Sequence, residues 1–179
     1  GRVELGLGVG WMREEFDALG VPWEKRGARN DEYIEAMRAL WQGPHAEYHG
    51  DFVDFEPATC SPRPVNGSIP IIVGGDSDAA ISRAVRIADG YFPGEGDIAQ
   101  LGALLNRVRQ AAEAAGRDPA SIEFSAIFGS QMANPEQGVE EMASIGVDRI
   151  MVPAFFFGGP EGLDHLDQLS ERIMPIANG

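Results

Sequence analysis

A glycine pair between an apolar run and a predicted helix start is the strongest sign of chemistry in this sequence. Residues 69–73 (IPIIV) lead directly into Gly74, Gly75, Asp76 and Ser77. Glycine lets a backbone approach a ligand closely, and the N–H groups and dipole at a helix start attract anions. The pattern therefore predicts a phosphate-binding loop at these four residues. The alternative is that the Asp76 carboxylate caps the helix and repels an anion.

A second glycine turn, GLGVGW at residues 6–11, joins another predicted strand to a helix. The dinucleotide-binding fingerprint requires glycine where Trp11 stands, so this turn does not predict a Rossmann nucleotide site. Gly8 and Gly10 would instead let a ring or a ribityl chain lie against the backbone, beside the flat apolar surface of Trp11. The alternative is a tight turn with Trp11 in the core.

Other candidate residues predict less chemistry. His45 and His49 are four residues apart, but Pro44 and a hairpin pattern place them on extended chain, so no metal site is expected. Residues 155–157 (FFF) follow the last predicted strand, where they would either wall an apolar pocket or pack against the final helix. The sequence contains neither a G-x-S-x-G elbow nor a P-loop, and we assign no catalytic residue.

The composition indicates a globular chain and excludes several classes of partner. The 179 residues are 44% hydrophobic and 23% charged, and the formal net charge is −14. Such a charge repels nucleic-acid backbones and anionic lipid surfaces, and no apolar run approaches the roughly 18 residues that a membrane span needs. Cys60 is the single cysteine, which excludes an internal disulfide framework. We therefore expect a cytoplasmic protein with no nucleic-acid or membrane partner.

Hydrophobic periodicity and glycine or proline stops predict alternating strands and helices. The alternation favours a mainly parallel sheet, either open and doubly wound or part of an eight-stranded barrel. Residues 44–68 interrupt it as an insertion that contains a hairpin. A closed (β/α)8 barrel takes about 250 residues. We therefore expect residues 1–179 to form a single domain with about the last five βα units, the C-terminal portion of a TIM barrel. The expected strands are residues 3–9, 69–73, 90–92, 122–128 and 150–153, and the expected helices are residues 11–19, 22–41, 78–88, 98–115, 136–144 and 162–176.

Three sequence blocks also carry a family resemblance. They are GLGVGWMREEFDALGVPWEKRGARNDEYIEAMRALW, YHGDFVDFEP and PRPVNGSIPIIVGGDSDAAISRAVRIADGYFP, in this order. Together they resemble the luciferase-like monooxygenase superfamily, especially its deazaflavin-dependent oxidoreductases. The resemblance covers residues 1–93 strongly and the later elements more weakly. It implies a TIM barrel with insertions, and coenzyme F420 (an 8-hydroxy-5-deazaflavin) or FMN as the cofactor.

The resemblance also implies roles for both glycine turns and includes departures from the family pattern. Asp76 stands where such proteins often carry a neutral or basic residue, and Asn66-Gly67 replaces a connection that more often contains glutamine. The first strands of the family barrel, which supply much of the substrate pocket, have no counterpart in this sequence. The implied phosphate-binding residues are Gly74, Gly75, Asp76 and Ser77, and the implied cofactor-lining residues are Gly8, Gly10 and Trp11.

The resemblance implies an oxidoreductase that transfers a hydride between the reduced cofactor and a small organic substrate. We prefer coenzyme F420 to FMN, because the blocks GVGW, EKRGAR and VGGDS are most similar to the deazaflavin branch. A deazaflavin reacts poorly with oxygen, so this preference favours a reductase or dehydrogenase over a monooxygenase. The alternatives are a noncatalytic flavin-binding protein, a phosphate-binding barrel isomerase or aldolase, and an inactive barrel fragment that needs its missing half. Exposed sheet edges lead us to expect a homo-oligomer.

Overall fold

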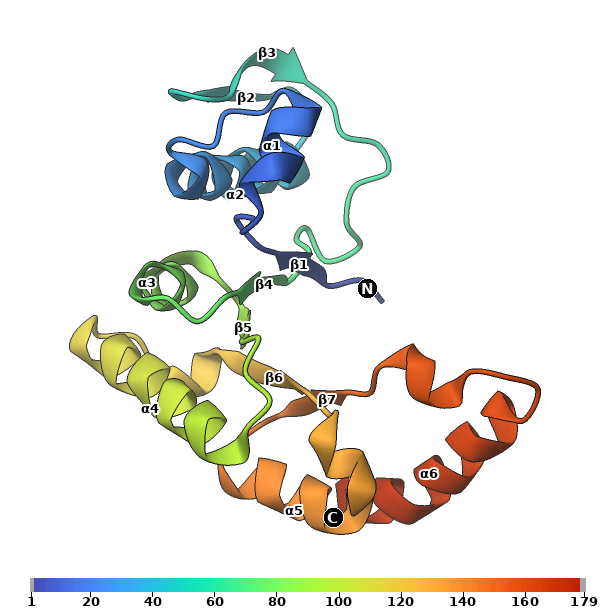
Figure 1. Cartoon of the computed structure of the whole chain (residues 1–179). Helices are drawn as coiled ribbons and strands as arrows, with labels where there is room; N and C mark the ends of the chain where they lie inside the picture. Colours follow the sequence, from blue (N-terminus) through green and yellow to red (C-terminus); the bar gives the residue numbers. More distant parts are fainter. Residues whose placement is uncertain (1, 178–179) are drawn as a thin grey trace. The chain divides into compact units, whose positions relative to one another are not determined.

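The computed structural model describes residues 2–177 and divides the chain into two compact units, residues 1–73 and 74–179 (Figure 1). The boundary falls within one strand, β4 (Ile71–Gly74). We describe each unit by itself. None of the described helices is long and apolar enough to cross a membrane.

The first unit contains a parallel strand pair. In this pair β1 (Leu5–Leu7) lies beside β4, with Leu5 opposite Ile71 and Leu7 opposite Val73. Ile71 and Val73 are almost completely buried, as the apolar run at residues 69–73 predicts for a core strand. The amide of Leu5 also donates to the carbonyl of Pro70. Because the two strands are parallel, their carboxyl ends lie at the same edge of the strand pair.

Two helices and a hairpin complete the first unit. Lys25 adopts a left-handed backbone conformation (φ 57°), so the second helix begins at Arg26, four residues after the predicted start. The hairpin strands pair antiparallel, as predicted for the insertion. These elements are α1 (Arg13–Leu19), α2 (Arg26–Gln42), β2 (Ala46–His49) and β3 (Asp54–Ala58).

The second unit contains three parallel strands, with β6 (Glu123–Ile127) between β5 (Gly90–Phe92) and β7 (Arg149–Met151). Its helices alternate with these strands in the chain, which is the pattern of an α/β fold. The helices are α3 (Asp78–Ile87), α4 (Ile98–Ala114), α5 (Pro135–Ser144) and α6 (Gly162–Ala177), with the short 3₁₀ turns η1 (Pro119–Ser121), η2 (Ser130–Ala133) and η3 (Ala154–Phe157).

Apolar side chains of α3, α4 and β6 form the core of the second unit. The apolar side chains of α3 recur at helical spacing and form a face that is buried, because it packs against α4. The buried residues of these elements include Ala80, Ile81, Ala84 and Val85 of α3, Leu101, Leu105 and Val108 of α4, and Phe124 and Ala126 of β6. This core fixes the strand ends from which the loops of the second unit begin.

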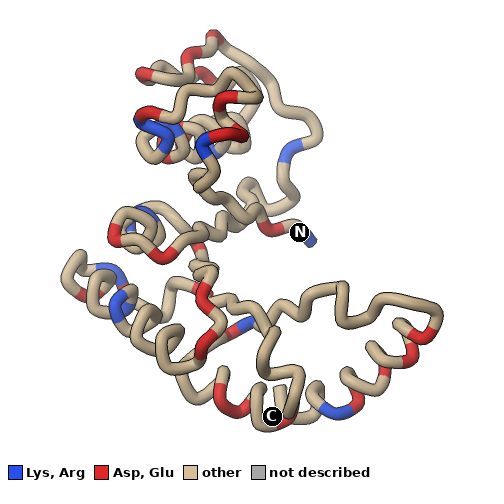
Figure 2. Tube along the Cα trace, in the orientation of Figure 1, with Lys and Arg blue, Asp and Glu red and all other residues tan. Residues whose placement is uncertain are grey.

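Every predicted strand and helix is present in the structure; β5 has the predicted bounds and the other elements have at least one shifted end. The strand expected at residues 3–9 is reduced to Leu5–Leu7, and the three 3₁₀ turns were not predicted. The net charge is −14, and the acidic residues that give rise to it occur along both units (Figure 2). The single-domain organisation of residues 1–179 stays a prediction.

Candidate functional site

The turn after β4 has a backbone conformation that favours glycine. Gly75 has φ +112°, and a Cβ atom placed there would lie 3.3 Å from the Cβ of Ala80. The hydroxyl of Tyr91 donates to the carbonyl of Gly75 over 2.7 Å. Tyr91 is completely buried, and burial, with the nearby charge of Asp76, raises the pKa of its hydroxyl. The hydroxyl therefore stays protonated and holds the turn from within the core.

Ser77, and not Asp76, caps the following helix. The Oγ atom of Ser77 accepts a hydrogen bond from the amide of Ala80 over 3.2 Å, at the start of α3. The carboxylate of Asp76 accepts instead from the amide of Gly94, over 2.9 Å, in the loop after β5. The alternative in which Asp76 caps the helix is therefore wrong.

The start of α3 retains the properties that suit an anion. First-turn N–H groups of a helix have no acceptor within the helix, and the helix dipole adds partial positive charge there. Asp78, the first residue of α3, forms an ion pair with Arg107 of α4, which offsets its negative charge. Gly75, Asp76 and Ser77 are exposed and Gly74 is half-buried, so a ligand can reach this turn.

A buried glutamine that the sequence patterns did not identify connects two further loops of the second unit. Gln131 lies in η2, after β6, and its side chain is 8% exposed. Its Oε1 atom accepts from the amide of Gly129 over 3.1 Å, and its Nε2 atom donates to the carbonyl of Gly96 over 3.2 Å. The amide orientation satisfies both groups. The loop after β5 is thus bonded both to Asp76 and to Gln131.

In the first unit, three side chains fix the turn at Gly10. Gly10 has φ +77°, and a Cβ atom there would overlap the ring of Phe16. The Nε atom of Arg26 donates to the carbonyl of Gly10 over 3.3 Å. The guanidinium of Arg26 stacks 3.7 Å above the ring centroid of Trp23, and Trp23 meets Phe16 edge to face at 5.1 Å. This cluster leaves little room for any residue except glycine at the turn.

Trp11 lies on the surface beside this turn. Its side chain is 81% exposed, so the alternative that places Trp11 in the core is wrong. Nothing lies within 4 Å of a Cβ atom placed on Gly8, which leaves open space against that backbone. The turn therefore presents bare backbone and a flat aromatic surface to solvent, as a ligand ring would require.

The predicted site residues belong to two groups. Gly8, Gly10 and Trp11 lie together in the first unit, and the residues from Gly74 to Ser77 lie together in the second. Leu7 is paired with Val73 in the parallel register, Gly8 follows the end of β1, and Gly74 is the last residue of β4. In parallel barrels, ligand-binding loops follow the carboxyl ends of the strands.

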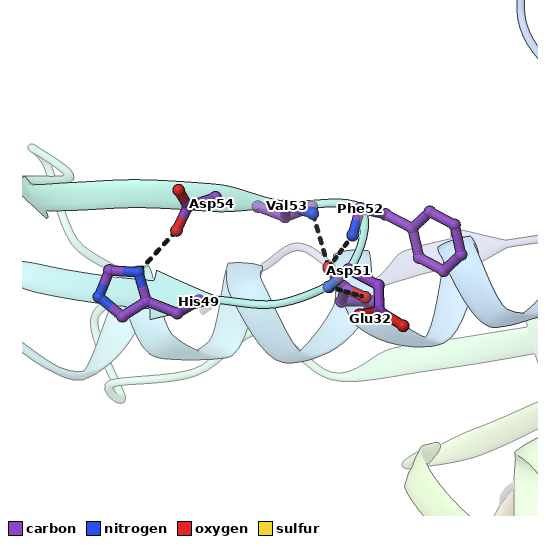
Figure 3. Close-up of polar contacts among 6 residues, drawn as sticks. All are labelled: Glu32, His49, Asp51, Phe52, Val53 and Asp54. Carbon is purple, nitrogen blue, oxygen red and sulfur yellow. Dashed lines mark hydrogen bonds and ion pairs between the residues drawn. The ribbon is translucent and has the colours of Figure 1, made fainter.

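The insertion hairpin is tied to α2 by one carboxylate (Figure 3). Oε1 of Glu32 accepts from the amides of Phe52 and Val53, each over 2.6 Å, and Oε2 accepts from the amide of Asp51 over 3.1 Å. His49 contacts Asp54 over 2.6 Å, and this hydrogen bond raises the pKa of the imidazole. Residues 2–177 contain no group of three or more histidine, cysteine or carboxylate side chains that could hold a metal ion.

Two other features lie outside these turns. A cleft of about 900 Å³ lies between α3 and α4, and its lining includes Arg86, Arg107 and Arg117 but no predicted site residue. In η3, Phe155 is 76% exposed and Phe156 36% exposed, with ring centroids 4.6 Å apart. The expectation of burial against the final helix is therefore wrong for Phe155, although η3 itself contacts α6.

Comparison with known proteins gives curated relatives in sequence. An uncharacterised protein of Mycobacterium tuberculosis (strain H37Rv) is 40% identical over 152 residues, which are 84% of this chain and 51% of the relative. An FMNH(2)-dependent dimethylsulfone monooxygenase of Pseudomonas putida is 34% identical over 120 residues, which are 65% of this chain and 33% of that relative. The chain thus spans about half the length, or less, of these curated relatives.

Solved structures share the fold at low sequence identity. The coenzyme F420 dependent tetrahydromethanopterin reductase from Methanopyrus kandleri has a TM-score of 0.75 and 17% identity, over 98% of this chain and 74% of that chain. The monooxygenase RslO1 from Streptomyces bottropensis has a TM-score of 0.74 and 21% identity, over 98% and 69% of the two chains. These likenesses confirm the predicted fold class, an α/β fold that forms part of a luciferase-like TIM barrel.

The model of one protein family accounts for nearly the whole chain. Its match extends over residues 1–171 and therefore includes both glycine turns, the insertion hairpin and all but the end of α6. The match also confirms the resemblance carried by the three sequence blocks. The chain belongs to the luciferase-like monooxygenase family.

Proposed function

We propose that this chain contributes the cofactor-binding part of an oxidoreductase that transfers a hydride between a reduced deazaflavin or flavin and a small organic substrate. The observation that carries the proposal is the turn between β4 and α3. Ser77 caps the helix while the Asp76 carboxylate is held by Gly94, so the helix start stays open to a phosphate group. The positive φ of Gly75 brings bare backbone to the same place.

The two glycine turns have different roles in this proposal. The turn before α3 receives the phosphate, because helix N–H groups and their dipole stabilise negative charge. The turn before α1 lies along the ring or the ribityl chain, because Trp11 is exposed beside open backbone. The proposed cofactor-binding residues are Gly8, Gly10 and Trp11 in the first unit, and Gly74, Gly75, Asp76 and Ser77 in the second.

Coenzyme F420 is the preferred cofactor, and FMN is the alternative. The blocks GVGW, EKRGAR and VGGDS support the deazaflavin. The names of the relatives support both: one neighbour in structure is coenzyme F420 dependent, and one relative in sequence is FMNH(2)-dependent. A bound reduced cofactor would supply the hydride, and the residues of this chain would bind and orient it. We assign no catalytic residue.

A fluorescence titration of the purified chain tests the proposal. Trp11 and the other tryptophans report binding as coenzyme F420 and, in a separate experiment, FMN are added. We expect saturable binding of one cofactor at micromolar concentration or below, and weaker binding of the other. Failure of both cofactors to bind would contradict the proposal. Binding without turnover of any substrate would favour the alternative of a noncatalytic flavin-binding protein.

Two matched glycine variants connect the binding to the proposed loop. Gly75→Asp places a side chain and a negative charge at the helix start, and we expect cofactor binding to be lost. Gly116→Asp is the control, because Gly116 also has positive φ (+73°) but lies beyond α4, and a Cβ atom placed on it would meet nothing within 4 Å. Equal loss of binding in both variants would mean that strain, and not the loop, explains the effect.

A further inference from the structure

Three loops of the second unit are joined by hydrogen bonds from two side chains. The loop after β4 carries Asp76, which binds the amide of Gly94 in the loop after β5. The loop after β6 carries Gln131, which binds the carbonyl of Gly96 in that same central loop. Both side chains therefore contact the short segment between β5 and α4. Asp76 does so from the loop after the preceding strand, and Gln131 from the loop after the following strand.

We propose that Asp76 and Gln131 are positioning residues that hold the phosphate-binding turn in its binding conformation through the loop after β5. The proposal rests on the proposed function, because it concerns the turn that receives the cofactor phosphate. Neither side chain needs to touch the cofactor, because the turn, Asp76 included, would meet the phosphate with its main chain. Their effect is to fix the backbone of the central loop and, through it, the carboxyl-end face of the second unit.

The contacts of Gln131 support a role in ordering backbone. Gln131 is buried, and both ends of its amide bond main-chain groups, the amide of Gly129 and the carbonyl of Gly96. Truncation of Gln131 would leave the half-buried amide of Gly129 and carbonyl of Gly96 without these partners, and would therefore favour a rearranged loop. The loop has its own ordering contact, since Glu95 Oε1 accepts from the amides of Gly96 and Asp97, each over 2.8 Å.

The position of Asp76 explains how a carboxylate can stand at an anion-binding turn. The negatively charged carboxylate of Asp76 accepts a hydrogen bond from the main-chain amide of Gly94. The hydroxyl of Tyr91 donates to the carbonyl of the adjacent Gly75. A negative charge still disfavours a bound anion, so two effects of opposite sign meet at this residue. The hydrogen bond orders the turn, whereas the charge weakens phosphate binding. Suitable substitutions separate the two effects.

Asp76→Asn and Asp76→Ala make that separation. Asparagine removes the charge but keeps an oxygen that can accept from Gly94, and alanine removes both. We expect Asp76→Asn to bind the cofactor as tightly as the unmodified chain or more tightly, and Asp76→Ala to bind it about five- to tenfold more weakly. If charge alone mattered, both variants would bind more tightly, and that result would overturn the proposal for Asp76.

Gln131→Ala and Gln131→Glu test the second residue. Glutamate keeps an acceptor for Gly129 but loses the donor to Gly96, and alanine loses both, so we expect weaker cofactor binding in each. Gln137→Ala is the matched control, because Gln137 is exposed on α5 and bonds Asn134 and Glu141. We expect this control to bind like the unmodified chain. Unchanged binding in both Gln131 variants would overturn the proposal for Gln131.

Amide hydrogen exchange, measured without cofactor, supplies the second readout. We expect Asp76→Ala to accelerate exchange at residues 75–77 and 94–97, and Gln131→Ala to accelerate it at 94–97 and 129–131, with the core of β6 unchanged. Faster exchange together with weaker binding supports the proposal, and unchanged exchange overturns it. If the unmodified chain binds neither cofactor, the proposed function fails, and the exchange data still show separately whether these side chains join the loops.

Discussion

Glu32 orders a distant hairpin turn through three main-chain hydrogen bonds. Its two carboxylate oxygens accept from consecutive amides at Asp51, Phe52 and Val53 (Figure 3). Arg29, one turn earlier on α2, lies with its guanidinium 4.6 Å from the ring centroid of Phe52. Residues of α2 therefore engage both the backbone and a side chain of the turn, which links the insertion to its own unit.

We predict that Glu32→Ala lowers the free energy of unfolding by about 2–3 kcal/mol, because several hydrogen bonds to a charged acceptor are lost together. Chemical denaturation followed by circular dichroism measures the change. Glu14→Ala is the control, since Glu14 is exposed on α1, and a surface substitution there should change the free energy by less than about 0.5 kcal/mol. Equal effects of the two substitutions would contradict the role of Glu32.

The imidazole of His49 is expected to have a raised pKa because of its hydrogen bond to Asp54. The hydrogen bond to Asp54 raises the pKa of His49 above its ordinary value near 6.5. A raised pKa in the folded state means that the protonated pair stabilises the fold below pH 6.5, and that this stabilisation disappears as the pH rises through the folded-state pKa. An NMR titration of the imidazole should show a pKa above 6.5 that falls toward 6.5 in Asp54→Asn. The same pKa in both proteins would contradict this assignment.

At the scale of elements, periodicity and stop signals sufficed to predict the helices and strands. Helix α3 is the clearest example, since an apolar run, two glycines and Ser77 preceded an apolar face, and each part of the pattern has its expected place. The same local signals predicted the turn at Gly75 but not its contacts. Which of two neighbouring polar residues caps a helix depends on the other donors and acceptors nearby. Here the amide of Gly94 donates to Asp76, and Ser77 caps the helix.

Contacts between elements far apart in sequence were not predictable. Gln131 joins loops that are 35 residues apart, and Arg117 donates to the carbonyls of Ala84, Val85 and Ala88 at the end of α3. No spacing pattern in the sequence identifies a glutamine or an arginine that makes such contacts, because the partner is a main-chain group in another element. The candidate site was therefore predictable as two glycine turns, while the side chains that hold the turns became evident only in the structure.

Removal of the Ser77 cap should destabilise α3 by a definite amount. We predict that Ser77→Ala lowers the free energy of unfolding by about 1 kcal/mol, whereas Ser77→Asp, which keeps an acceptor for the amide of Ala80, lowers it less. Ser82→Ala, at an exposed position within α3, is the control and should have little effect. Denaturation midpoints of the three variants measure the difference. If Ser82→Ala and Ser77→Ala agreed, the cap assignment would be contradicted.

At the scale of the whole molecule, charge and exposed apolar surface have opposing effects on self-association. A net charge of −14 on 179 residues keeps copies apart at low salt. Exposed apolar side chains, in contrast, occur on three consecutive elements of the second unit, β7, η3 and α6. They are Met151, Phe155, Phe156, Leu163, Leu166 and Met174. Exposed apolar surface of this kind favours contact with another protein surface, and salt weakens the opposing repulsion.

We therefore predict that the chain forms a homo-oligomer whose fraction increases with salt concentration. Light scattering coupled to gel filtration should give a mass that is a multiple of the 19.3 kDa chain. Substitution of Phe155 and Leu163 together by glutamate adds charge where the apolar surface is exposed, and should shift the mass toward 19.3 kDa. Val65→Glu is the control, because Val65 is 87% exposed but lies in the first unit. A monomer at every salt concentration would mean that the exposed apolar side chains of β7, η3 and α6 do not bind a second copy.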